Sequence, residues 1–354
     1  MGYPEINLAH LRMITDCTGV FQHAVHSVPN RKLGYTTDDN ARALIVAAKQ
    51  YERTNAREDL DLAIIYLSYL HYAQNSEHNF RNLMTFSREF LDEVGTEDSY
   101  GRAMWACGYA ASSGLPENIR VVAAKLFDDG IVWAGDLQSP RARAYVMLGM
   151  YYYLQKNKEK GDLRSKIDAL ADSLIVGLRA HSTKDWQWYE TYLTYGNAIL
   201  PLGMLVAAEI TGRRVYKDAA KTTTQFLADT LVINDRLEVI GNNGWYMRDG
   251  KRAWYDQQTI DAGYTVHLFA EAYKLLGDKA FQNLAHIAHS WFFGNNRSGV
   301  WVYDPQTAGC YDAIAPWGLN LNQGAESCIC FLLAQFAMQE ILENSKTDST
   351  SCKP

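Results

Sequence analysis

The stretch ARALIVAAKQYERTNAREDLDLAIIYLSYLHY, residues 41–72, decides the fold class. Its first part, residues 41–50, is apolar on nearly every side, which is typical of a helix buried inside a protein. After a polar turn, residues 60–72 carry apolar side chains at helical spacing with polar ones between them, which indicates an outer helix packed on the inner one. The stretch therefore predicts one helical hairpin.

The same alternation recurs along the chain, which is the mark of a repeat architecture. Segments that are apolar nearly all round occupy residues 41–50, 102–111, 141–154, 200–210, 262–276 and 325–342. Amphipathic segments occupy residues 6–13, 60–72, 119–127, 163–178, 215–231 and 281–291. Six inner and six outer helices in alternation predict an all-α fold, a single (α/α)6 barrel of helical hairpins that spans residues 1–343.

Two kinds of segment fall outside this pattern. Residues 78–90 and 237–254 mix polar and aromatic side chains with turn signals, so we expect short hairpins there on the barrel rim. Residues 344–354 are polar and show no periodicity, and we expect them to form a disordered tail.

Composition excludes several classes of partner. The 354 residues are 47% hydrophobic and carry 34 Lys and Arg against 40 Asp and Glu, a net charge of −6 without any basic run, which argues against nucleic acid. The apolar stretches are broken before the roughly 18 residues of a membrane span, so no membrane is expected. No signal segment is visible and the six cysteines show no paired spacing, which predicts free thiols and a cytoplasmic location.

A polar, aromatic cluster precedes each inner helix. Helix capping explains one Asp, Ser or Asn in each cluster but not the Trp, Gln or second carboxylate beside it. The clusters occupy residues 37–40, 97–99, 139–141, 186–190, 255–258 and 320–326. If the inner helices run parallel, all six clusters meet at one mouth of the barrel and form an acidic, aromatic-lined pocket.

This mouth supplies the carboxylates that glycoside cleavage needs, one protonated and one ionised. The candidate catalytic residues are Glu190, Asp39, Asp38, Asp256 and Glu326. We favour Glu190 as the general acid, because Trp186 and Trp188 would exclude water and keep its proton. Asp39 or Asp256 would be the ionised partner. Of the adjacent Asp38 and Asp39, we expect one to cap its helix and the other to face the cavity.

Other side chains of the mouth suit sugar binding, since aromatic faces stack on pyranose rings and amides bond hydroxyl groups. The candidate substrate-binding residues are Arg42, Trp186, Trp188, Tyr195, Gln257, Gln258, Trp317, Asn322 and Gln323. A guanidinium can hold a carboxylate ionised. We therefore expect at least one of four arginines to contact Asp38, Asp39 or Glu326. These arginines are Arg31, Arg42, Arg141 and Arg143.

Other chemistries find little support in the sequence. No phosphate-binding GxxxxGK[ST], no GxGxxG after a strand and no GxSxG elbow is present. His286 and His289 lie one helical turn apart, but they lack a third ligand and the Glu of a zincin, so we expect an outer-helix surface pair. The sequence therefore predicts neither a metal nor a cofactor.

Several blocks of the chain resemble a known domain. Residues 16–43, DCTGVFQHAVHSVPNRKLGYTTDDNARA, resemble the opening of a helical-barrel domain often fused C-terminal to bacterial and archaeal family 4 glycosyltransferases. Residues 193–198, 255–258 and 322–327 look like further blocks of that domain. The resemblance implies the six-hairpin glycosidase superfamily, a carbohydrate substrate and a separately encoded glycosyltransferase as a partner. It also implies an Asp at the position of Gly196, so no acid or base role is expected there.

The leading hypothesis is a glycoside hydrolase, or else a phosphorylase, that acts on an oligosaccharide or a polysaccharide end. An alternative on the same barrel is a sugar 2-epimerase, which abstracts a proton beside a carbonyl with histidine, and His23, His26 and His267 are its candidates. A non-catalytic glycan-binding module is the third. Carboxylates about 6.5–9.5 Å apart would favour inversion, about 5.5 Å retention, and converging histidines epimerisation.

Overall fold

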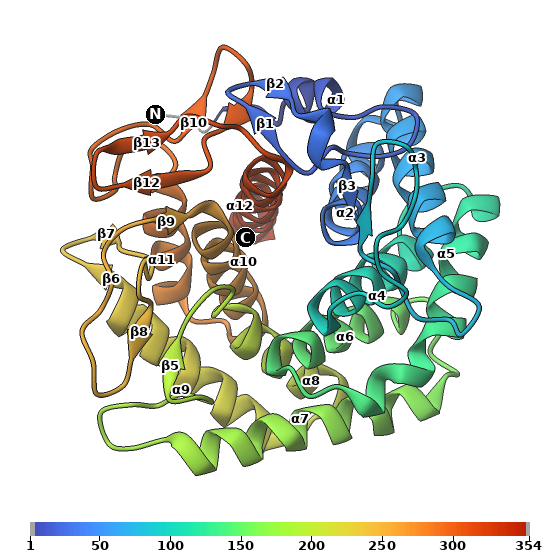
Figure 1. The fold of residues 1–354 in the computed structure, drawn as a ribbon. Helices are drawn as coiled ribbons and strands as arrows, with labels where there is room; N and C mark the ends of the chain where they lie inside the picture. The colour runs from blue at the N-terminus through green and yellow to red at the C-terminus, as the bar shows by residue number, and fades with distance from the viewer. Residues whose placement is uncertain (1–3, 352–354) are drawn as a thin grey trace.

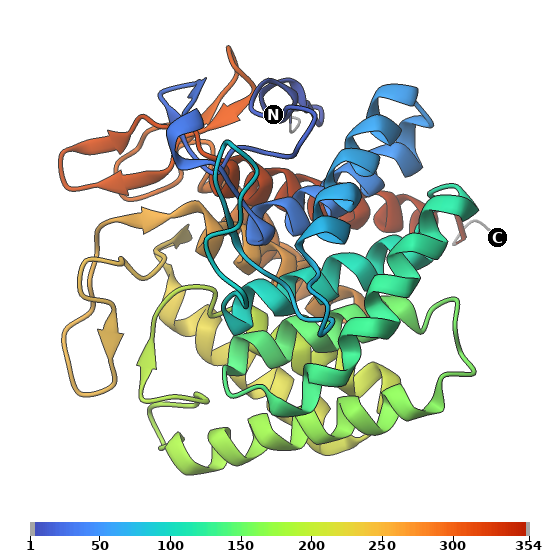
Figure 2. The same cartoon turned by 45° about the vertical axis from the view of Figure 1, so that its right-hand side comes forward.

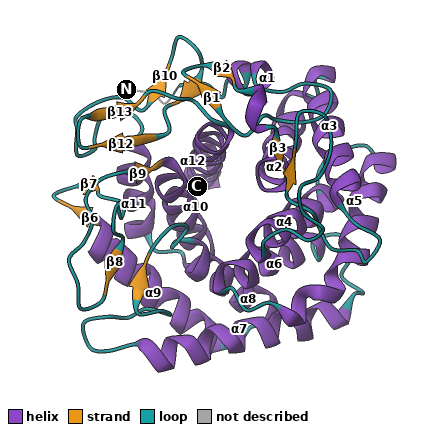
Figure 3. Ribbon diagram, viewed as in Figure 1, coloured by secondary structure: helices purple, strands orange, loops and turns teal. Residues whose placement is uncertain are grey.

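The computed structural model describes residues 4–351 and shows two concentric rings of helices (Figures 1 and 3). The inner ring consists of α2 (Thr37–Thr54), α4 (Glu97–Ser112), α6 (Pro140–Tyr153), α8 (Ile199–Thr211), α10 (Thr259–Leu276) and α12 (Ala325–Ser351). Each inner helix packs on the next, and α12 packs on α2, which closes the ring.

The outer ring covers the inner one. It consists of α1 (Ala9–Met13), α3 (Arg57–Ala73), α5 (Glu117–Gly130), α7 (Gly161–His181), α9 (Arg214–Leu231) and α11 (Lys279–Ser290), with the 3-10 helices η1 (Arg31–Leu33) and η2 (Ile131–Asp136) beside them. From α3 onward each outer helix packs on the inner helix before it, and α1 packs on α12. The (α/α)6 barrel predicted from the alternation of helices is confirmed.

Close contact between inner helices depends on small residues. A Cβ on Gly108 of α4 would lie 2.1 Å from the carbonyl oxygen of Gly149 on α6, and real Cβ atoms do not approach so closely. Glycine at both positions lets the two helices touch backbone to backbone. The same demand for a dry interior explains why the segment Ala325–Glu343 of α12 is apolar enough to cross a membrane, contrary to the sequence expectation, while most of it is buried inside the ring.

The strands are short and gather toward the end at which the inner helices begin (Figure 2). All the pairings are antiparallel. They are β1 (Ala24–Val25) with β2 (Val28–Pro29), β3 (Tyr35–Thr36) with β4 (Leu83–Met84), β5 (Tyr192–Leu193) with β8 (Tyr246–Met247), β6 (Val232–Ile233) with β7 (Arg236–Leu237), β10 (Tyr303–Asp304) with β11 (Gly309–Cys310), and β12 (Ala313–Ala315) with both β13 (Gly318–Asn320) and β9 (Gln257–Gln258).

The rim strands tie distant parts of the chain together. The segments expected to be local hairpins, residues 78–90 and 237–254, contribute β4 and β8, and each pairs with a strand that precedes a different inner helix. At the other end of the chain, α12 continues to Ser351, beyond the expected boundary at residue 343. The last residues of the expected tail, 352–354, lie outside the described residues, as does Cys352. The other five cysteines are free.

Candidate active site

The first turn of α2 presents two adjacent carboxylates at the mouth of the barrel. Thr36 is the N-cap, and its Oγ1 accepts a hydrogen bond of 3.1 Å from the backbone nitrogen of Asp39. The expectation that one aspartate caps the helix was therefore wrong. Because Thr36 takes that role, both Asp38 and Asp39 line the cavity above the helix.

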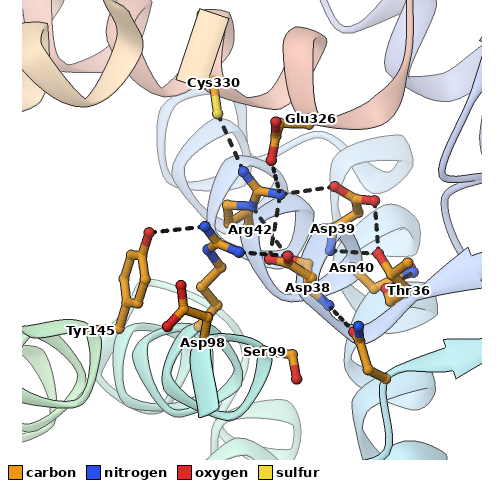
Figure 4. Close-up of polar contacts among 12 residues, drawn as sticks. Thr36, Asp38, Asp39, Asn40, Arg42, Asp98, Ser99, Tyr145, Glu326 and Cys330 are labelled. Carbon is orange, nitrogen blue, oxygen red and sulfur yellow. Dashed lines mark hydrogen bonds and ion pairs between the residues drawn. The ribbon is translucent and has the colours of Figure 1, made fainter. Parts of the chain in front are cut away.

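Arg42, one turn further along α2, gathers three carboxylates (Figure 4). Its Nη2 lies 2.9 Å from Asp39 Oδ1, 3.2 Å from Glu326 Oε2 and 3.4 Å from Asp38 Oδ1. The guanidinium is only 1% exposed, whereas the side chains of Asp38 and Glu326 are 24% and 39% exposed. The predicted contact between a mouth arginine and these carboxylates is confirmed, with Arg42 as the arginine.

A second buried arginine, which the sequence reasoning missed, holds Asp38 from the other side. Arg102 of α4 donates from Nη1 to Asp38 Oδ2 at 2.5 Å and from Nη2 to the Tyr145 hydroxyl at 3.0 Å. Its position has a sequence signal, because Arg102 follows Asp98 by four residues as Arg42 follows Asp38, each pair at the start of an inner helix. The repeated D-x-x-x-R spacing would have found it.

The two guanidiniums share three carboxylates, so one carboxyl group is left without a full counter-charge. Burial raises the pKa of Asp39 to about 7; Arg42 opposes this shift, and the nearby Asp38 and Glu326 reinforce it. Burial alone would also raise the pKa of Asp38, but Arg102 and Arg42 outweigh it and hold that pKa below its ordinary value. Near neutral pH, Asp39 therefore shares its site with a proton while Asp38 is ionised.

The spacing of these two groups is short. Asp38 Oδ1 and Asp39 Oδ1 both lie within 3.4 Å of the same Arg42 nitrogen. Two atoms so placed are separated by less than the lower limit of about 6.5 Å seen for the carboxyl pair of inverting glycosidases, which must leave room for a water molecule. The pair is spaced for direct attack on a sugar carbon.

These carboxylates form the floor of a cavity of about 520 Å³. Its walls come from the α2 and α12 helix starts and from the rim strands. They include Gln22, His23, Asn82, Asn242, Asp256, Gln258, Asp312, Trp317, Asn320 and Ser327. Of the predicted site residues, the cavity thus brings together Asp38, Asp39, Asp256, Glu326, Gln258 and Trp317. Trp317 is 80% exposed at the β12–β13 turn, so its ring is available for stacking.

Glu190 does not fit the role expected for it. Its carboxylate lies 3.0 Å from Arg141 Nη1, a pairing that stabilises the ionised form rather than the protonated form a general acid needs. Trp186 bonds the backbone oxygen of Glu190 through Nε1, and Trp188 stacks on Phe226 away from the mouth. The expected tryptophan wall around this carboxyl group is therefore absent, and Glu190 borders a separate cavity of about 310 Å³.

We expect Glu190→Gln to leave the pH profile of catalysis unchanged and to lower stability by about 1–3 kcal/mol, because Arg141 keeps a hydrogen-bond acceptor but loses its counter-charge in a buried site. Urea unfolding and the pH dependence of kcat would measure the two effects. Loss of the alkaline limb of the pH profile in a folded Glu190→Gln protein would return Glu190 to the acid role.

Three predicted amides have structural roles instead. Gln257 is fully buried, donates to Glu238 Oε2 at 2.9 Å and accepts from Trp291 Nε1 at 3.0 Å. Gln323 is likewise buried, with its Nε2 3.0 Å from Asp304 Oδ2. Asn322 Oδ1 accepts from the backbone nitrogen of His26, which fastens the β1–β2 turn. None of these three amide side chains is free to read a substrate.

The other mouth loops meet at the same end of the barrel, as predicted. Ser139 Oγ donates to Asp98 at 2.7 Å, and the predicted binding residue Tyr195 donates from its hydroxyl to the same carboxylate at 2.9 Å. Asp261, in the first turn of α10, accepts from the backbone nitrogen of Gly196 at 2.8 Å, and burial raises its pKa to about 7. Asp261 is a second protonatable carboxyl group that was not among the favoured catalytic residues.

The three histidines considered for proton abstraction do not converge. His23 lines the cavity, and His26 lies exposed on the β1–β2 turn. His267 is buried in α10 against Trp105, where burial lowers its pKa to about 4. His289, expected at the surface, is buried, with its Nε2 3.0 Å from Gln335 Oε1. Within residues the structure describes, no cluster of three His, Cys, Asp or Glu side chains is arranged to hold a metal ion.

No family model matches the sequence, and no curated protein matches it either. Solved structures do resemble the fold. A cellobiose 2-epimerase from Bacillus thermoamylovorans has a TM-score of 0.74 at 11% identity, over 95% of this chain and 96% of that one. A D-mannose isomerase has a TM-score of 0.71 at 14% identity, over 95% and 96%.

A GH76 α-mannanase from Bacteroides thetaiotaomicron is also similar, with a TM-score of 0.62 at 10% identity over 88% of each chain. At such low identity the likeness shows the (α/α)6 barrel alone. The chemistry must be inferred from the residues at the mouth.

Proposed function

We propose that this protein is a carbohydrate-active enzyme, and specifically a glycoside hydrolase with Asp39 as its general acid and Asp38 as its ionised partner. The observation that carries the proposal is the placement of two adjacent carboxyl groups on one cavity floor in opposite environments. Asp38 is held ionised by two guanidiniums, and Asp39 is pushed toward the protonated form by burial. Such a divergence is how acid and base roles are assigned to a pair of carboxyl groups.

The geometry gives each group a step. Asp39 donates its proton to the glycosidic oxygen as the bond to the anomeric carbon breaks, and Asp38 attacks that carbon at the short spacing typical of retaining enzymes. Water then displaces Asp38, and Asp39 takes up the water proton and returns to its starting state. Arg102 keeps Asp38 aligned through the 2.5 Å contact and draws negative charge away from a departing carboxylate.

The substrate class follows from the lining and from the structural neighbours. The exposed Trp317 ring offers a stacking face, and the amides of Asn82, Asn242 and Gln258 offer partners for hydroxyl groups. The names of the neighbours refer to cellobiose, mannose and α-mannan. We infer a gluco- or manno-configured oligosaccharide or polysaccharide end. The cytoplasmic location and the glycosyltransferase partner expected from the sequence stay predictions.

A sugar 2-epimerase is the second candidate, favoured by the TM-score of 0.74 to the cellobiose 2-epimerase and by His23 at the cavity wall. Proton abstraction and return by histidine normally calls for imidazoles that reach the same sugar carbon. His267 is buried on α10 beside Trp105 and is not among the cavity-lining residues, so His23 would need a carboxyl group as its partner.

One assay separates the two reactions. The protein is incubated with gluco-, manno- and galacto-oligosaccharides in deuterated water, and products are resolved by chromatography and proton NMR. Hydrolysis yields shorter sugars without deuterium at carbon 2, which is the expected result. Deuterium at carbon 2 of an intact oligosaccharide would establish epimerisation, and binding without turnover of any substrate would favour a glycan-binding module.

A further inference from the structure

The cavity walls are strongly biased in charge. Five carboxyl groups line them, whereas among the lining residues no arginine or lysine is present and His23 is the single basic side chain. The five are Asp38, Asp39, Asp256, Asp312 and Glu326. A concave site lined by one sign of charge concentrates ligands of the opposite sign and repels those of the same sign.

The two arginines of the site do not cancel this bias at the cavity surface. The side chains of Arg42 and Arg102 are 1% and 4% exposed, and they lie behind the carboxylates they bind. An anion could reach either guanidinium only by displacing Asp38 or Asp39 from a charge-assisted hydrogen bond. The arginines therefore neutralise part of the floor without offering a site for a phosphate or a carboxylate.

Two of the wall carboxylates stand away from these arginines. Asp312 Oδ1 accepts hydrogen bonds from the backbone nitrogen of Gly324 at 2.9 Å and from Ser327 Oγ at 2.6 Å. Asp256 makes no side-chain hydrogen bond or ion pair within the described part of the chain, so its charge is directed at the cavity. Their negative charges face the ligand without an arginine in contact.

We infer that the cavity accepts neutral and amine-bearing sugars and excludes uronic acids, sugar phosphates and inorganic phosphate. This inference rests on the proposed hydrolase and decides its attacking group. Because phosphate is excluded, water must complete the reaction: the glycosidic bond breaks, the leaving oxygen takes the Asp39 proton, and the water oxygen bonds the anomeric carbon while its proton returns to Asp39. The phosphorylase alternative is thereby removed.

Equilibrium binding tests the inference without any turnover. Glucosamine, glucose and glucuronate, and the corresponding manno-configured trio, are titrated by calorimetry at about pH 6, where the amine is protonated, together with inorganic phosphate. We expect the amino sugar to bind at least tenfold more tightly than the uronate, with the neutral sugar between them and no phosphate binding. The ratio should shrink as salt is added, because ions screen charge.

Asp256→Asn is the sharpest variant. Asp256 has a positive φ of 43°, a conformation that Asn tolerates well, so the change removes a charge with little strain. We expect Asp256→Asn to reduce the amine-to-uronate ratio about threefold or more. Asp218→Asn, on the outer helix α9, changes the net charge equally and should leave that ratio unchanged.

The outcomes are distinguishable. Uronate or phosphate binding as tight as that of the neutral sugar would overturn the inference and leave the hydrolase standing. An equal loss of the ratio in Asp218→Asn would also overturn it, since the selection would then reflect net charge rather than the cavity wall. If no sugar of either trio binds, the carbohydrate function itself fails and the inference falls with it.

Discussion

Asp39→Asn lowers kcat by about 10²–10⁴-fold, the range that loss of a general acid typically costs. Asn keeps the size of the side chain and an oxygen that can still bond Thr36 and Arg42, but it carries no transferable proton. Because burial raises the pKa of Asp39 to about 7, the wild-type rate should fall as pH rises above about 7, where the acid form is depleted. The residual rate of Asp39→Asn should show no such limb.

The measurement is the pH dependence of kcat for whichever oligosaccharide is cleaved. Asp249→Asn is a matched control, since its carboxylate is 90% exposed and outside the cavity lining, and it should retain the wild-type profile. Substrates with a better leaving group, such as aryl glycosides, need less acid help and should restore part of the activity of Asp39→Asn. Wild-type turnover by a folded Asp39→Asn protein would remove Asp39 from the mechanism.

The fold was predictable because it is written in local periodicity. The stretch at residues 163–178 repeats an apolar side chain at helical spacing, and Leu163, Ile167, Leu170 and Leu174 are all buried in α7 as that pattern requires. The strands were harder to place, because each is two or three residues long and pairs with a distant segment. Tyr192 opposes Met247, for example, and neither neighbourhood carries an alternating pattern that would reveal it.

The site was predicted in outline and missed in detail for a related reason. Sequence position placed Asp38, Asp256 and Glu326 at one mouth, because each opens an inner helix, and the cavity brings them together. The state of each carboxyl group depends instead on its nearest cation, which comes from another helix. Glu190 meets Arg141, 49 residues away, and Asp38 meets Arg102, 64 residues away.

Arg42→Met should lower the free energy of unfolding by about 3–5 kcal/mol, the usual cost of removing one partner from a buried ion pair. Met fills a similar volume, so the loss is electrostatic: three carboxylates that shared two guanidiniums are left with Arg102 alone. Urea unfolding measures the change. Arg53→Met is the matched control on the same helix, because Arg53 is 38% exposed, and it should cost about 1 kcal/mol or less.

The pH dependence identifies the cause of that loss. In the wild type, the lowered pKa of Asp38 contributes stability above its ordinary pKa, and this contribution disappears as pH falls through the lower folded value. Without Arg42, the carboxyl groups have raised pKa values in the folded protein, so their contribution is largest in acid and is lost as pH rises. The difference between wild type and Arg42→Met should therefore widen from about pH 5 to about pH 8.

A second substitution separates charge from packing. In Arg42→Met with Asp39→Asn, one of the stranded carboxylates is gone, so the pair should be more stable than the sum of the single changes predicts, by about 0.5–3 kcal/mol. A loss that does not vary with pH and is not relieved by Asp39→Asn would mean that Arg42 acts through packing. Because the same three carboxylates line the substrate cavity, that result would also weaken the assignment of opposite protonation states to Asp38 and Asp39.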